Sequence, residues 1–246
     1  ALANCEALTE VVFEEGMTAI PDNIMRNESY TSHVKKVELP ETVEEIGDNA
    51  FKGNGELETD RVPSKTEMIG GNAFDGCASI ESMEFPETIK EIGNSAFANC
   101  TSLQTVTMTD NAEEGYEAKI GNLVFSGCTS LASVHLSENV VSLGARFIEN
   151  TAVNSITIPK NVRESGMLAN GVSPSLKYNG ALANCEALTE VVFEEGMTVI
   201  PDNIMRSESY ISYVSRVIIP SSVLSIGENA FIGCDNMTIY GYTNSY

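Results

Sequence analysis

Apolar residues along this chain recur with a period of about 23 residues. The clearest unit runs from Cys77 to Phe97 and reads C-x2-L-x2-V-x-I-P-x2-V-x2-I-G-x2-A-F when written generally. Its last position is an apolar slot that can be followed along the whole chain, at Leu2, Met25, Phe51, Phe74, Phe97, Phe125, Phe147, Leu182, Met205 and Phe231. Self-similarity at a fixed period of this length indicates a repeat architecture.

Each unit predicts the same local elements. The V-x-I alternation predicts a short strand with one buried face, and the proline that follows ends it. The I-G-x2-A-F part predicts a turn that enters a single helical turn, where polar residues such as Asp48 and Asn94 would cap free N–H groups. One unit is too short to bury its own apolar face, so neighbouring units must stack.

Stacking gives an α/β repeat fold. We expect a right-handed solenoid with short parallel strands on one face and short helical turns on the other. Neighbouring strands would lie about 4.7–4.9 Å apart. Because the two faces differ in width, we expect the array to curve, with the strands on its concave side.

The pattern resembles the BspA-type leucine-rich repeats of bacterial, and some protozoan, cell-surface proteins. The residues that carry the resemblance are the repeated signature Ile92, Gly93, Ala96, Phe97, Cys100, Leu103 and Val106 and their counterparts. The resemblance covers nearly the whole chain and implies a leucine-rich-repeat solenoid.

Residues 1–246 are predicted to form one solenoid of about nine coils. Residues 1–53 match residues 181–233, so the chain contains a super-repeat of 180 residues. Because the chain cuts through this super-repeat, we expect it to be a fragment of a longer protein. Two coils are expanded, one by Asp110–Lys119 and the other by Asn161–Gly180.

One residue contradicts the core pattern. Asp60 occupies a slot that holds Val, Met or Ile in other coils. Burying an unpaired carboxylate is costly. We therefore expect this coil to be locally shifted.

Charge narrows the classes of partner. The chain has 14 Lys and Arg against 35 Asp and Glu, a net charge of −21. Such a chain is repelled by nucleic acid and by anionic membrane surfaces. No apolar run approaches the length of a membrane span, so no direct membrane insertion is predicted for these residues.

All six cysteines occupy the same repeat slot, which other coils fill with Asn or Glu. The main interpretation is a buried thiol that acts as a small apolar side chain. Cys77, Cys100 and Cys128 lie in adjacent coils at a spacing that permits disulfides, although their side chains would point in parallel. The cysteines show no C-x2-C pair and no matched histidines, so zinc is not expected.

No catalytic constellation appears. His33 is replaced by Tyr213 in the duplicated segment, and His135 occupies an outward strand position. Nucleophile elbows, phosphate loops and metalloprotease motifs are missing, and residues 110–114 are a poor match to a calcium loop. We predict no enzymatic activity, no cofactor and no metal.

The outward strand positions are the first candidate binding site. The residues of this strip, from coil to coil, are Glu38, Arg61, Glu84, Thr107, His135 and Thr157, flanked by Val12 at one end and by Val192 and Ile218 at the other. Repeat solenoids use such surfaces to bind proteins. Simple exposure to solvent is the alternative interpretation.

The long insert is a second candidate. Leu176, Lys177 and Tyr178 lie in the segment that expands the coil after Asn161. Long loops on regular scaffolds often carry function, although tolerated drift explains them equally well.

The resemblance implies a non-catalytic protein-binding module at the cell surface or secreted, with adhesion to host or microbial glycoproteins. The alternative is a structural spacer or a self-associating coat element, in which coils associate end to end.

Overall fold

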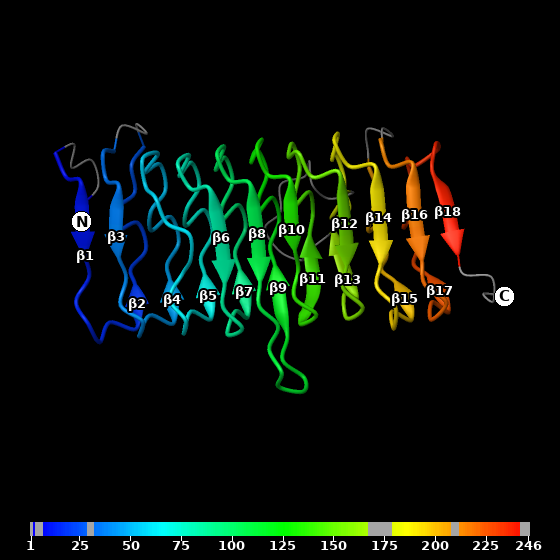
Figure 1. Ribbon diagram of the computed structural model, residues 1–246, viewed down its shortest axis with the longest axis horizontal. Coiled ribbons are helices and arrows are strands. Elements are labelled where there is room, and N and C mark those ends of the chain that lie inside the picture. Colours follow the sequence, from blue (N-terminus) through cyan, green and yellow to red (C-terminus); the bar gives the residue numbers. More distant parts are fainter. Residues whose placement is uncertain (1, 3–6, 29–31, 167–178, 208–211, 242–246) are drawn as a thin grey trace.

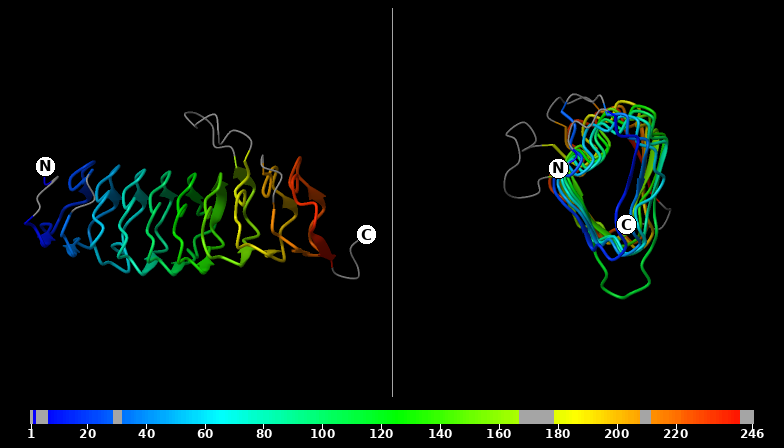
Figure 2. Two further views of the ribbon diagram at one scale, coloured as in Figure 1. Left: turned by 90° about the horizontal axis from the view of Figure 1, so that it is seen from above. Right: turned by 90° about the vertical axis from the view of Figure 1, so that its left-hand side faces the viewer.

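The computed structural model describes residues 2, 7–28, 32–166, 179–207 and 212–241. It is a parallel β-solenoid in which the coils follow one another from β1 at one end to β18 at the other (Figure 1). The row is nearly straight in the two lengthwise views (Figures 1 and 2). The expectation of a curved array with a concave strand side is therefore not met, and hollows on this surface are local.

One set of strands, here called the front strands, comes from the V-x-I part of each unit. Its outward residues are exposed and its inward residues are mostly buried, as the alternation predicts. The front strands are β1 (Glu10–Val12), β3 (Lys36–Glu38), β6 (Ser82–Phe85), β8 (Thr105–Met108), β10 (Ser133–His135), β12 (Ser155–Ile158), β14 (Glu190–Phe193), β16 (Arg216–Ile219) and β18 (Thr238–Gly241).

A second set, the back strands, was not predicted. It comes from the residues just before the I-G glycine, such as Glu45 and Ile46, where only one exposed and one buried residue are regular. The back strands are β2 (Ala19–Ile20), β4 (Glu45–Ile46), β5 (Met68–Ile69), β7 (Glu91–Ile92), β9 (Ala118–Ile120), β11 (Val140–Gly144), β13 (Glu164–Gly166), β15 (Val199–Ile200) and β17 (Ser225–Ile226).

All strand pairs are parallel, and the pairing is interrupted in three places. The back strands form one sheet from β2 to β13 and a second from β15 to β17. The front strands form three sheets, β1–β3, β6–β8–β10 and β12–β14–β16–β18. The front surface therefore has two breaks, one after β3 and one after β10.

The predicted helical turns are wrong, because the described residues contain no helix. The second residue after the I-G glycine adopts a left-handed conformation, as at Asn49, where φ is 54°. This conformation is incompatible with a right-handed helix. The N–H groups of Asn49 and Phe51 instead reach the carbonyls of Gly71 and Ala73 in the next coil, at 2.9 and 2.7 Å. The segment is thus a turn that is stacked between coils.

The core lies between the front strands, the back strands and these turns. Successive phenylalanines of the Phe slot stack along the solenoid axis, with ring centroids 5.2 Å apart for Phe51 and Phe74 and 4.9 Å apart for Phe74 and Phe97. Each of these rings is at most 2% exposed. The slot residues therefore pack against both neighbouring coils, as expected for units that cannot fold alone.

Candidate functional site

The front strands bring the predicted strip residues into one column. Register pairs Arg61 with Glu84 through an isolated bridge, and then pairs Glu84 with Thr107 and Thr107 with His135. Glu38 lies in the sheet before this series and Thr157 in the sheet after it. The six predicted residues thus share one face, and the two breaks in strand pairing fall between Glu38 and Arg61 and between His135 and Thr157.

The first break is explained by Asp60. Asp60 is exposed, whereas Met83 at the same slot of the next coil is 1% exposed. Because a carboxylate is costly to bury without a partner, the chain turns Asp60 outward and Thr59–Arg61 forms no strand with β3. The coil is thus irregular at Asp60, although Arg61 keeps the register of the repeat with Glu84, so a shift of the coil stays a prediction.

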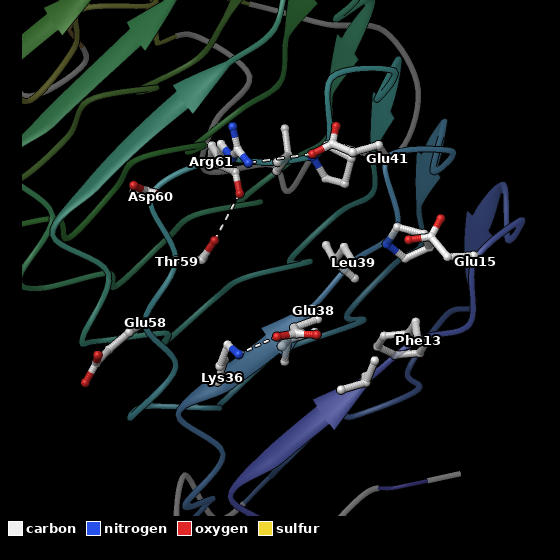
Figure 3. Close-up of a pocket in the computed structure, with 15 residues that line it drawn as sticks. Phe13, Glu15, Lys36, Glu38, Leu39, Glu41, Glu58, Thr59, Asp60 and Arg61 are labelled. Carbon is white, nitrogen blue, oxygen red and sulfur yellow. Dashed lines mark hydrogen bonds and ion pairs between the residues drawn. The ribbon is translucent and has the colours of Figure 1, made fainter.

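A groove of about 500 Å³ lies at this break. Figure 3 shows Lys36 and Glu38 on β3, with Thr59, Asp60 and Arg61 on the other side of the opening. Its lining residues are Val12, Phe13, Glu15, Lys36, Val37, Glu38, Leu39, Pro40, Glu41, Glu58, Thr59, Asp60, Arg61, Val62 and Pro63. We call this the Asp60 groove.

Both cations of the Asp60 groove are already paired. Lys36 contacts Glu38 and, at 3.1 Å, Glu10, and these hydrogen bonds raise the pKa of Lys36. Arg61 lies 3.7 Å from Glu41. The pKa of Glu41 is lowered chiefly because the Ser64 backbone N–H donates to its Oε2 at 2.8 Å, and Arg61 adds to this. The groove therefore keeps an excess of negative charge.

A smaller groove of about 230 Å³ lies at the second break. His135 and Thr157 line it, together with the carboxylates of Asp110, Glu138 and Glu194. Asp110 is held in place because its Oδ1 accepts a hydrogen bond from the Glu138 N–H at 2.7 Å. We call this the His135 groove. The sequence placed His135 and Thr157 on the strip but did not single out the three carboxylates, which come from the segments after β8, β10 and β14.

Asp110 belongs to the expanded coil, which projects from the row between β8 and β9 (Figure 1). Asn111 ties the loop to the preceding coil, since its Nδ2 donates to the Glu87 carbonyl at 3.0 Å. The Tyr116 hydroxyl donates to the Thr88 carbonyl in the same way. The second candidate, Leu176, Lys177 and Tyr178, lies outside the described residues.

The cysteine slot is a packing position. Cys77, Cys100, Cys128, Cys185 and Cys234 are free and buried, which confirms the main interpretation for these five, while Cys5 lies outside the described residues. The Cys100 thiol donates to the Phe74 carbonyl of the preceding coil at 3.3 Å. Asn54, at the same slot, donates to the Met25 carbonyl at 2.9 Å. At these two positions the thiol and the amide thus both supply a small donor that reaches the preceding coil.

The cysteines and His33 occupy packing and surface positions in the described part of the chain. Burial raises the pKa of the Cys77 and Cys185 thiols, so neither is a ready nucleophile. His33 contacts the Glu56 carboxylate at 2.8 Å on the exposed surface. Among the described residues there is no group of three or more His, Cys, Asp or Glu that could hold a metal ion. That part of the chain also contains no helix able to cross a membrane.

Comparison with known proteins places the chain in a family. A model of the "BspA type Leucine rich repeat region (6 copies)" matches residues 22–118, 61–177 and 117–238. The chain belongs to the BspA-type leucine-rich repeat family. The prediction drawn from the repeat signature is therefore confirmed. A comparison with curated proteins finds no match.

Solved structures of other repeat proteins are similar to this BspA-type chain. A leucine-rich repeat protein from Bacteroides ovatus is 24% identical, with a TM-score of 0.48, and the match covers 95% of this chain and 66% of that one. A leucine rich cell surface protein from Faecalibacterium prausnitzii is 21% identical, with a TM-score of 0.41 and coverage of 98% and 61%. The chain thus spans less than two thirds of the length of either protein.

Proposed function

We propose that this BspA-type chain is a non-catalytic protein-binding module that acts at the cell surface or after secretion, through its front strip. The observation that supports this most directly is the position of the two grooves. Both lie on the front face, each at a break in strand pairing, and together they contain Glu38, Arg61, His135 and Thr157. A concave site on a regular repeat scaffold is the usual place for a ligand.

The charge of the chain indicates the kind of partner. With a net charge of −21, the surface attracts proteins that present basic patches. Such attraction raises association rates and weakens with added salt. Adhesion to host or microbial glycoproteins is the form of binding that this proposal favours.

Biolayer interferometry tests the proposal. The folded, monomeric chain is measured against immobilised matrix and plasma glycoproteins at about 50 mM and about 300 mM salt, a range across which surface electrostatics is progressively screened. Saturable binding to one glycoprotein that weakens at the higher salt supports an adhesin. No binding to any member contradicts it.

A structural spacer is the second candidate, and the duplicated segment favours it. Glu10 and Lys36 form an ion pair that Glu190 and Arg216 repeat at the corresponding positions, at 3.1 and 3.2 Å. The neighbouring outward residue Glu38, however, is replaced by Ile218. The ion pair that links neighbouring coils is therefore repeated, whereas the outward side chain beside it changes. This pattern is expected of a spacer that becomes longer by duplication of its repeats. Concentration-dependent end-to-end association in sedimentation velocity would support this candidate.

A further inference from the structure

The floor of the Asp60 groove exposes peptide groups that a regular ladder would use. In β3, the Lys36 N–H donates to the Thr9 carbonyl, and the Glu38 carbonyl accepts from the Phe13 N–H. The peptide groups of Lys36 and Glu38 therefore point toward β1. Alternation along a parallel strand then directs the N–H and C=O of Val37 toward the coil that contains Arg61. Among the described residues, neither group has a backbone partner there.

The side chains around this floor are acidic. Of the seven charged residues that line the groove, five are carboxylates and two are cations. Both cations are paired with carboxylates, as described above. Glu15, Glu58 and Asp60 take part in none of the ion pairs of the described residues. A ligand that enters the groove therefore meets uncompensated negative charge.

Asp60 causes both properties. A Val or Met at this slot would be buried, as Met83 is in the next coil. It would let the segment Thr59–Arg61 form ladder hydrogen bonds with the peptide groups of Val37. The acidic residue instead breaks the ladder and adds a carboxylate to the opening. A residue that violates the local pattern of a regular fold without an evident gain in stability is expected at a functional site.

We propose that the Asp60 groove binds an extended, basic segment of a partner protein. The segment's main chain meets the N–H and C=O of Val37, and its Lys or Arg side chains meet Glu58, Asp60 and Glu15. Recognition of an extended peptide by an unpaired strand edge uses the same main-chain hydrogen bonds as a sheet. This inference rests on the proposed protein-binding function and specifies the chemistry of the ligand.

Two ten-residue peptides test the proposal against the whole chain. Both are acetylated and amidated; one alternates Lys with Thr, and the other alternates Glu with Thr. Isothermal titration calorimetry at about 50 mM salt, where surface charges are little screened, is expected to show binding of the Lys peptide only. Hydrogen exchange is expected to show that this peptide slows exchange of the Val37 amide.

Variants separate the groove from bulk attraction. Asp60→Val removes one charge and is expected to restore the ladder, whereas Glu91→Val removes the same charge from back strand β7. Asp60→Val should weaken binding of the Lys peptide at least 10-fold and slow Val37 exchange without peptide, while Glu91→Val should change affinity less than 2-fold. Asp60→Asn keeps the polar side chain and serves as a second variant, for which a weakening of about 3-fold or more is expected from the lost charge.

Equal weakening by Asp60→Val and Glu91→Val would overturn the proposal, because only net charge would then matter. Absence of peptide binding would overturn it too. If a glycoprotein binds the Asp60→Val variant but no longer binds the Arg61→Glu variant, the front strip remains a binding surface and the proposal for the Asp60 groove is wrong. If the Lys peptide binds in the groove but no glycoprotein binds the chain, the adhesion proposal is wrong and the proposal for the Asp60 groove stands.

Discussion

The Asp48 carboxylate accepts a hydrogen bond from the backbone N–H of Gly71, 2.6 Å away in the next coil. The same relationship recurs from coil to coil. Asp22 Oδ1 accepts from the Asp48 N–H at 2.8 Å, and Asn94 Oδ1 accepts from the Asn122 N–H at 2.8 Å. Asp48 and Asn94 follow the I-G position and were expected to cap helices, and Asp22 occupies the same slot after Ile20-Pro21. They instead bind each coil to the next.

Replacing Asp48 by alanine is therefore expected to destabilise the solenoid. The Gly71 N–H would lose its acceptor, and loss of a capping acceptor costs about 1–2 kcal/mol. Asp48→Asn should change the free energy of unfolding by less than about 0.5 kcal/mol, because an amide oxygen can take the same bond, as at Asn94. Urea unfolding of the three proteins checks this, and equal losses in both variants would contradict it.

The glycine of the I-G pair is required by close approach of neighbouring coils. A Cβ built on Gly93 would lie 2.6 Å from the Gly71 nitrogen and 2.7 Å from the Gly70 carbonyl carbon. Gly93→Ala should therefore cost about 1–3 kcal/mol through overpacking. Gly55→Ala is the matched control, since its Cβ would meet only the Gly76 oxygen at 3.9 Å. Thermal melts of the two variants check this, and an equal fall of both midpoints would contradict the prediction.

Leu123 occupies the left-handed position of its turn, where φ is 56°. The equivalent residue is asparagine at positions 49, 72 and 229. Because a side chain such as leucine is strained in this conformation and asparagine tolerates it, Leu123→Asn is expected to stabilise the chain by about 0.5–1 kcal/mol. The reverse change, Asn72→Leu, should destabilise it by a similar amount. Opposite shifts of the urea midpoint would confirm both, and shifts of the same sign would contradict them.

Much of this fold follows from the sequence, because the repeat multiplies weak local signals. The alternation around Met83 and Phe85 recurs in many coils and defines the front strands. The back strands were missed, since two residues such as Glu45 and Ile46 have no period to detect. The prediction of helical turns was wrong. Ala-Phe after a glycine is compatible with a helix, but the residue before Ala-Phe is left-handed, which only the backbone of the structure shows.

The candidate site was predictable only in part. The column from Arg61 to His135 follows from counting outward positions, because strand register preserves the repeat period. Asp60 was noticeable as a break in the core pattern. The grouping of Asp110, Glu138 and Glu194 beside His135 was not predictable, since these residues are up to 84 positions apart and meet only when the coils stack.

Charge reversal at Arg61 probes the front strip. Arg61→Glu would break the contact with Glu41, adding a carboxylate to a groove that is already acidic. A partner that binds Arg61 through an acidic side chain should lose affinity about 10-fold, mainly through slower association, because Arg61 is exposed. The basic segment proposed for the Asp60 groove should instead gain affinity, because the groove becomes more acidic. Arg163→Glu is the control, because Arg163 pairs with Glu117 away from the front strands and the change in net charge is the same. Unchanged affinity in biolayer interferometry would remove Arg61 from the binding site.

The buried thiols make stability depend on alkaline pH. Burial raises the pKa of Cys77, Cys100 and Cys185 above the ordinary value of 9.0. Above pH 9 the unfolded chain loses thiol protons that the folded chain keeps, so the folded state binds more protons and stability falls as pH rises. Below pH 9 both states keep these protons and the effect vanishes.

Each of these thiols should lower the free energy of unfolding by about 1.4 kcal/mol per pH unit above 9, so the three together give about 4 kcal/mol. Urea titrations at pH 8, 9 and 10 measure the slope under reducing conditions. Cys185→Ser is the control, because serine does not titrate in this range and should reduce the slope by about one third. A slope that is unaffected by this substitution would show that tyrosines or lysines, rather than the stacked thiols, set the alkaline limit of the fold.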